Sequence, residues 1–382
     1  MKAVRTLVTG ATGYIGSRLV TALLSDGHDV VAASRDPDRL ADFGWSDRVS
    51  TVALDAHDED SARAAFDQAG RIDVVYYLVH GIGQPGFREA DNRAAANVAT
   101  AAKAAGVRRI VYLGGFVPDD DSLSEHLTSR AEVAAALHVD GGPDVVWLGA
   151  AIVIGAGSTS FEMLRYVADR FLLLPMPDWS ANPIDPISVR DALYYLVAAA
   201  DSDTVPAGSY DICGPETTTY GDLLRTYAKA AGIWRTPVAV HGIDTGLVSK
   251  VTGIILPVPG GLAGDLVESL DYPMMASEDG LLERVPEPPG GRIGVEDAIR
   301  RSVTSPRRRP VDELADPHHL ADTDPDWAGG DALRLRRLAC AVTPSVLHPV
   351  LGLIDEIPGP VAAAMRTGVD TVLGLVPKVG SA

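Results

Sequence analysis

The chain of 382 residues has little cysteine, few aromatic residues and no long uninterrupted apolar run. Its two cysteines, Cys213 and Cys340, are too few for a disulfide framework and lack the spacing of a metal site. We therefore expect a reducing, cytoplasmic location and no bound metal. The uncharged run from Val251 to Gly264 contains Pro257 and Pro259. It is too short and too interrupted for a transmembrane segment, which takes about 20 residues.

Positive charge is also scarce. The chain has 33 Lys and Arg residues against 51 Asp and Glu residues, a formal net charge of −18. Such a surface repels nucleic acid and anionic lipid, so we expect no nucleic-acid partner and take a small-molecule substrate as the partner. Hydrophobic residues make up 46% and charged residues 22% of the chain, which is typical of a folded globular protein.

The feature that organises the chain is the glycine motif Thr9–Gly16, which directly follows an apolar run at residues 4–8. The run predicts a buried strand, and apolar residues at helical spacing from Tyr14 to Ser25 predict a helix. A strand, a glycine turn and a helix are the context of a dinucleotide-binding motif, with the pyrophosphate at the helix N-terminus. The alternative is an ordinary strand-to-helix turn. The flanking elements favour cofactor binding, with Gly10 for the turn, Gly13 for the close phosphate and Gly16 for helix packing.

Strands and helices alternate in the same way further along the chain. Predicted strands cover residues 30–33, 49–54, 73–79, 109–113 and 145–148, and predicted helices cover 58–68, 89–105 and 124–137. This order predicts an α/β Rossmann-like doubly wound parallel sheet with helices on both faces. We divide the chain into an NAD(P)-binding domain at 1–235, a substrate-side, cleft-covering region at 236–304, and a linker with a helical C-terminal extension at 305–382. A homodimer interface, a lid and peripheral membrane contact are the open alternatives for this extension.

The ends of the predicted strands supply candidate cofactor contacts, because ligands bind at the carboxyl ends of strands in open α/β sheets. Ser34 and Arg35 follow the second strand, where a hydroxyl and a cation suit a ribose 2′-phosphate. We therefore favour NADP, with NAD as the alternative, and interpret Asp36 as a turn residue. The full set of expected cofactor contacts is Gly10, Thr12, Gly13, Tyr14, Ile15, Gly16, Ser34, Arg35, Asp55, Ala56, Val79, His80, Gly81 and Gly114.

Four motifs together resemble one known group of proteins. Thr9–Gly16, Tyr76–His80, Arg108–Gly115 and Ser160–Tyr166 are similar to the motifs of atypical short-chain dehydrogenase/reductases, specifically the NmrA-like, YbjT-like NAD(P)-binding proteins. The resemblance covers roughly residues 1–300 and implies a Rossmann-like core with NADP or NAD at the first glycine turn. The segment Asp324–Gly330 also resembles the junction at which many relatives begin a further C-terminal domain.

The resemblance also implies where catalytic residues stand. Typical members use Tyr-x-x-x-Lys, and this chain has His126 and Arg130 at those two positions, with Gly114 or Gly115 in place of the upstream serine. We predict that His126 donates the proton and that Arg130 holds the cofactor, because histidine titrates near neutral pH and arginine stays charged. The alternative is an exposed histidine at a helix start capped by Ser124.

These observations predict an NADP-dependent oxidoreductase that transfers a hydride between the nicotinamide and a small, fairly apolar substrate. We expect the Ser158–Ser160 turn, the loop around Trp179 and the apolar segment 247–270 to hold this substrate. The alternative function is a non-catalytic NAD(P)(H)-binding redox sensor or assembly factor, as some NmrA-like relatives are. A nucleotide-sugar epimerase is a third option, against which the missing Tyr-Lys pair argues.

Overall fold

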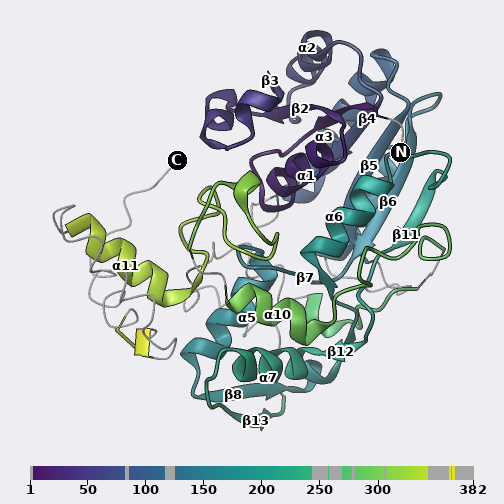
Figure 1. The fold of residues 1–382 in the computed structure, drawn as a ribbon. Coiled ribbons are helices and arrows are strands. Elements are labelled where there is room, and N and C mark those ends of the chain that lie inside the picture. Colours follow the sequence, from purple (N-terminus) through teal and green to yellow (C-terminus); the bar gives the residue numbers. More distant parts are fainter. Residues whose placement is uncertain are drawn as a thin grey trace.

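The computed structural model describes residues 3–81, 86–116, 125–242, 257, 269–277, 280–304, 307–342, 361–362 and 364–365. Within them, a large sheet with its helices forms one part of the molecule, and a group of helices and short strands forms the other (Figure 1). None of the helices in these ranges combines the length and the apolar character needed to cross a bilayer.

The sheet has seven strands in the order β11-β6-β5-β4-β1-β2-β3, and every pairing in it is parallel. The order reverses direction at β1, as in a dinucleotide-binding fold, so the predicted fold class is confirmed. The strands are β1 (Arg5–Val8), β2 (Asp29–Ser34), β3 (Ser50–Ala53), β4 (Val74–Tyr77), β5 (Arg109–Gly115), β6 (Asp144–Ala150) and β11 (Gly208–Asp211).

Helices cover both faces of this sheet. On one face, α1 (Tyr14–Ser25) packs beside α6 (Val189–Ala198); on the other lie α2 (Glu59–Ala69), α3 (Phe87–Ala104) and α4 (Glu125–Ala136) (Figure 1). Successive side chains of a strand point to opposite faces, so Tyr76 joins the first apolar cluster and Tyr77 the second. Burial on both faces explains why these strands are apolar throughout.

A third apolar cluster lies beyond the carboxyl end of β6 and is built from α5 (Thr159–Arg170), α7 (Tyr220–Ala230) and α10 (Val295–Val303). Short strands surround it in three two-stranded pairings. These are β7 (Val153–Ile154) with β10 (Ile187–Ser188), β9 (Pro183–Ile184) with β12 (Thr218–Thr219), and β8 (Leu173–Pro177) with β13 (Thr236–Val240). This cluster places α5 opposite the sheet edge at which ligands bind in α/β folds.

Residues 307–330, which we call the C-terminal strap, return to the first helix of the chain. The Arg18 guanidinium on α1 donates to both carboxylate oxygens of Asp324, at 2.9 and 2.7 Å, and to the carbonyls of Pro317 and His319. The two charged side chains are only 1% and 2% exposed. A buried bidentate ion pair therefore joins α1 to the strap, and α11 (Gly330–Val342) follows it.

Arg308, in the segment that the sequence predicts to be a linker, is part of the folded strap. Arg308 donates to the backbone carbonyls of Asp324, Pro325 and Ala328, so its guanidinium fixes the shape of the strap. Desolvation of this group and the nearby charge of Arg337 lower the pKa of Arg308 to about 10. The arginine nevertheless stays charged at neutral pH and serves as an internal donor.

We predict that Arg18→Met lowers the free energy of unfolding by about 3–5 kcal/mol, because it leaves the Asp324 carboxylate buried without its partner. Urea denaturation followed by circular dichroism measures this loss. Lys229→Met is the matched control, since the Lys229–Glu296 pair is 73% and 64% exposed and contributes about 0–1 kcal/mol. Equal losses in the two variants would contradict the structural role of the buried pair.

Candidate functional site

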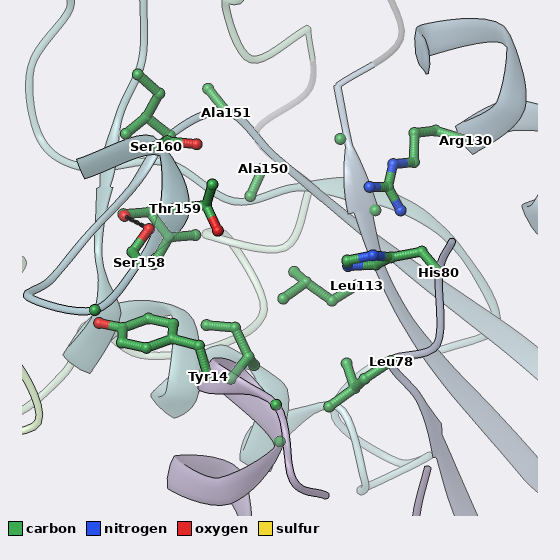
Figure 2. Close-up of a pocket in the computed structure, with 18 of the residues that line it drawn as sticks. Tyr14, Leu78, His80, Leu113, Arg130, Ala150, Ala151, Ser158, Thr159 and Ser160 are labelled. Atoms are coloured by element: carbon green, nitrogen blue, oxygen red, sulfur yellow. Dashed lines mark hydrogen bonds between the residues drawn. The ribbon is translucent and has the colours of Figure 1, made fainter. Parts of the chain in front are cut away.

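A cavity of about 390 Å³ lies between the glycine turn, the carboxyl ends of β4, β5 and β6, and the start of α5. Figure 2 shows Arg130 and His80 on one side of this cavity and Tyr14, Ser158, Thr159 and Ser160 on the other. The described residues that line it are Gly10, Gly13, Tyr14, Ile15, Gly16, Leu78, His80, Leu113, Gly114, Gly115, Arg130, Ala150, Ala151, Ile152, Val153, Gly157, Ser158, Thr159, Ser160, Ile184, Tyr220, Leu270, Met274, Pro325 and Trp327.

The glycine turn brings the backbone close to the cavity. Gly10 has φ +65°, a conformation that side chains disfavour, and a Cβ on Gly16 would lie 2.2 Å from the Gly10 carbonyl oxygen. Helix α1 starts at Tyr14, and its N-cap residue Gly13 supplies no side-chain cap. The free N–H groups of the first turn and the helix dipole therefore favour an anion here, which fits the diphosphate of a dinucleotide.

Tyr14 joins this turn to the rest of the site. Its ring lies 4.0 Å from the Arg18 guanidinium carbon, and its hydroxyl is buried without a hydrogen-bond partner in the described part of the chain. Burial raises the pKa of Tyr14 well above its usual value, so the phenol stays protonated and remains a potential donor. Gly155 accommodates the ring, because a Cβ there would lie 2.0 Å from the hydroxyl oxygen.

Arg130 and His80 place charge on the opposite wall. Arg130 comes from α4 and is 8% exposed, and the figure shows its guanidinium next to the His80 ring (Figure 2). The His80 side chain faces the cavity, but protein atoms packed around it remove much of its hydration. This desolvation and the positive charge of Arg130 lower the pKa of His80 below its usual range. The imidazole is therefore neutral at physiological pH. Arg130 forms no ion pair with any described carboxylate, so its charge is available to a ligand.

Two glycines end β5, at the place where typical short-chain dehydrogenase/reductases have a serine. Only one of them lacks the space for a side chain. A Cβ on Gly114 would lie 2.6 Å from Trp147 Nε1 and 2.9 Å from a ring carbon of Tyr112. A Cβ on Gly115 would have Arg130 Cγ as its nearest neighbour, at 3.8 Å. A side chain at residue 114 thus collides with the rings of Trp147 and Tyr112, whereas residue 115 has room for a side chain.

The start of α5 forms the remaining wall. Its N-cap residue is Ser158, whose hydroxyl donates to the Val153 carbonyl at 2.8 Å and does not cap the helix. Like α1, α5 therefore has no side-chain cap from its N-cap residue. Thr159 and Ser160 line the cavity at its first turn. Two helix N-termini, those of α1 and α5, consequently border one cavity, and both favour electron-rich ligand groups.

Comparison with known proteins agrees with this geometry. Residues 10–138 match the family described as NAD(P)H-binding. The chain is 29% identical to a 3-diazoavenalumate denitrifying reductase of a Streptomyces species, over 60% of this chain and 82% of that protein. It is 28% identical to a ceramide reductase of Caulobacter vibrioides, over 69% of this chain and 77% of that protein.

A solved nucleoside-diphosphate-sugar epimerase from Staphylococcus aureus has the same fold, with a TM-score of 0.61 and 16% identity over 78% of this chain and 99% of that chain. At this identity the likeness concerns the fold alone. The predicted resemblance to atypical short-chain dehydrogenase/reductases is confirmed at distant identity, and NAD(P)(H) binding is confirmed with it.

The structure brings only some of the predicted contacts to the cavity. Gly10, Gly13, Tyr14, Ile15, Gly16, His80, Gly114 and Arg130 line it, and Thr12, Ser34, Arg35, Asp55, Ala56, Val79 and Gly81 do not. The predicted contacts that do not line the cavity include the residues after β2 and β3, where a dinucleotide places its adenosine. There Arg35 is exposed and forms no ion pair with a described residue, and Asp36 accepts from the Asp38 N–H as a turn residue does. His126 lies in α4, but its side chain is outside the described residues, so its role stays a prediction.

The substrate side differs in detail from the prediction. Ser158, Thr159 and Ser160 line the cavity as expected, but Trp179 does not; it packs edge-on against Tyr220, which does. Most of 247–270 lies outside the described residues, and Leu270 is its one described member on the wall. Sequence reasoning missed several lining residues, among them residues 150–153, Pro325 and Trp327. Residues 150–153 could have been identified from the sequence, because they follow a predicted strand and strand ends line the ligand crevice. No pattern in the sequence marks Pro325 and Trp327 as lining residues.

We predict that Gly114→Ala lowers the free energy of unfolding by about 1–3 kcal/mol, because the added methyl group overpacks against Trp147 and Tyr112. Gly115→Ala is the matched neighbour and is expected to change it by no more than about 0.5 kcal/mol. Urea denaturation of both variants measures the difference. A Gly114→Ala variant as stable as the parent would show that the rings of Trp147 and Tyr112 move aside without lowering the free energy of unfolding.

Proposed function

We propose that this protein is an NADP-dependent reductase that transfers a hydride from the nicotinamide to a small, fairly apolar acceptor. The single observation that carries the proposal is the continuous cavity that joins the glycine turn to Arg130, His80 and the uncapped start of α5. Its distant relatives named as reductases support the reaction class.

The residues present fit the cofactor. The close approach of Gly16 to Gly10 leaves the first turn of α1 open to a diphosphate, and Arg35 stands exposed at the end of β2. We assign Arg35, with the Ser34 hydroxyl beside it, to the 2′-phosphate of NADP, which a guanidinium binds through two parallel hydrogen bonds.

The bound nicotinamide would supply the hydride; the surrounding side chains supply position and charge. Arg130 offers a buried, permanent positive charge that holds a ribose hydroxyl or stabilises negative charge on the acceptor. Burial raises the pKa of Tyr14 and of Tyr220 well above the usual value, so both phenols stay protonated. We assign proton donation to His126, whose residue type titrates near neutral pH.

The lining suggests the character of the acceptor. Ile184, Leu270 and Met274 give the cavity an apolar wall on the side of the third cluster, which is built from α5, α7 and α10. Of the described lining residues none is a carboxylate, and Arg130 is a fixed cation, so a cationic acceptor is disfavoured. An uncharged or anionic apolar molecule with one reducible polar group fits best.

We predict that His126→Ala slows NADPH oxidation with a carbonyl, enone or quinone acceptor by about 100-fold or more, because it removes the general acid. NADPH affinity, measured by fluorescence titration, should change far less. His138→Ala is the control, since this exposed histidine follows α4 and does not line the cavity. Tight NADPH binding without turnover of any acceptor would favour a redox sensor instead of an enzyme.

We predict that Arg35→Ala weakens NADPH binding by about 10-fold or more and leaves NADH binding nearly unchanged, because only NADPH carries the 2′-phosphate. Isothermal titration calorimetry with both nucleotides measures the two affinities. Arg63→Ala, which removes an exposed arginine of α2 paired with Glu59 and Asp60, is the control. Equal losses for NADPH and NADH in Arg35→Ala would remove the assignment to NADP.

A further inference from the structure

We propose that the C-terminal strap is the size-determining wall of the substrate cavity, with Pro325 and Trp327 as its specificity residues. Both line the same cavity as the glycine turn and the start of α5. The inference rests on the proposed function, because it concerns which acceptor enters the cavity of that reductase. It assigns to the last part of the described chain a role in substrate selection.

Trp327 lies on the α5 side of the cavity. It packs against one small apolar cluster of Ala156, Leu320 and Ala328 and against Tyr166 of α5 in another. Arg130 lies across the cavity from the start of α5 (Figure 2). The cavity is thus bounded by a fixed positive charge on one side and by an aromatic side chain near its other side.

The strap is held in place on the side of the cofactor turn. Asp324, directly before Pro325, forms the buried pair with Arg18 and also accepts from the Ala321 N–H at 2.7 Å. A Cβ on Gly157 would lie 2.7 Å from an Asp324 carboxylate oxygen, so the strap approaches the loop before α5 as closely as a glycine allows. Arg308 binds the carbonyls that flank this point.

The strap is also clamped to α5. Glu162 is fully buried, and its two carboxylate oxygens accept from the Gly157 N–H at 3.0 Å and from the Gly329 N–H at 2.9 Å. The Tyr166 hydroxyl donates to the Trp327 carbonyl. One carboxylate therefore fixes the start of α5 and the strap together, and Trp327 keeps its place relative to Thr159 and Ser160. A wall held in this way sets a limit on length and does not adapt to longer substrates.

The substrate class follows from the residues at the two opposite ends of the cavity. The acceptor has a polar reducible group that lies toward Arg130 and His80 and a compact apolar body that extends toward Trp327. Apolar walls gain affinity with each buried methylene group until the cavity is full, and the next group then collides with the wall. The strap thus predicts a sharp upper limit of acceptor length, and shortening Trp327 shifts this limit upward.

The test uses the NADPH-loaded full chain and straight-chain 2-alkenals of increasing length. Displacement of bound anilinonaphthalene sulfonate reports binding without turnover, and NADPH oxidation reports kcat/KM. We expect an affinity that rises with chain length to a limit in the parent protein. In Trp327→Ala the limit moves to longer alkenals, with a gain of about 10-fold or more for those just beyond the parent's limit, and NADPH affinity stays unchanged.

Trp234→Ala is the control, since this tryptophan is 76% exposed and does not line the cavity, and it should leave the limit where it is. If Trp327→Ala does not fold, Trp327→Leu keeps an apolar group against Tyr166 and tests the same limit. An unchanged limit in a folded Trp327 variant overturns the proposal, even where turnover is normal. A shifted limit in the displacement assay without any turnover supports the strap as the wall and counts against the reductase.

Discussion

The site depends on one close approach, that of α1 to the turn before it. Gly16 packs so tightly against Gly10 that no side-chain carbon fits between them. This contact sets the helix N-terminus beside the end of β4, where free N–H groups are available to a diphosphate. The parallel order of the sheet, which reverses at β1, then brings the ends of β4, β5 and β6 to the other side of the same cavity.

Helix α1 also joins the start of the chain to the C-terminal strap. One turn after the glycines, Arg18 binds Asp324 across a separation of 306 residues. The pair is removed from solvent, so it contributes more to fixing the position of the strap than to net stability, whereas loss of one partner is costly. The segment that resembled the junction to a further domain in relatives here contributes Pro325 and Trp327 to the wall of the cavity.

The electrostatics of the site differ from those of the whole chain. The protein has a formal charge of −18, yet the cavity has two helix N-termini, a buried arginine and a neutral histidine around it. The Arg130 guanidinium and the N-termini of α1 and α5 favour anionic or electron-rich ligand groups at the cavity. The buried phenols of Tyr14 and Tyr220 add neutral donors to this environment, because desolvation keeps them protonated.

Local patterns by themselves determined the parallel sheet, the bounds of α1 and the part of the site that lies at strand ends, including His80. They succeed there because hydrophobic period, glycine spacing and strand ends are properties of neighbouring residues. The place of Arg130 in the site was implied only through family resemblance, and its position beside His80 was not predicted. Tertiary structure alone decided that Gly114 has no room for a side chain and that Trp327 reaches the cavity. Both depend on contacts between distant segments, such as Trp147 with Gly114 and Arg18 with Asp324, which no local pattern encodes.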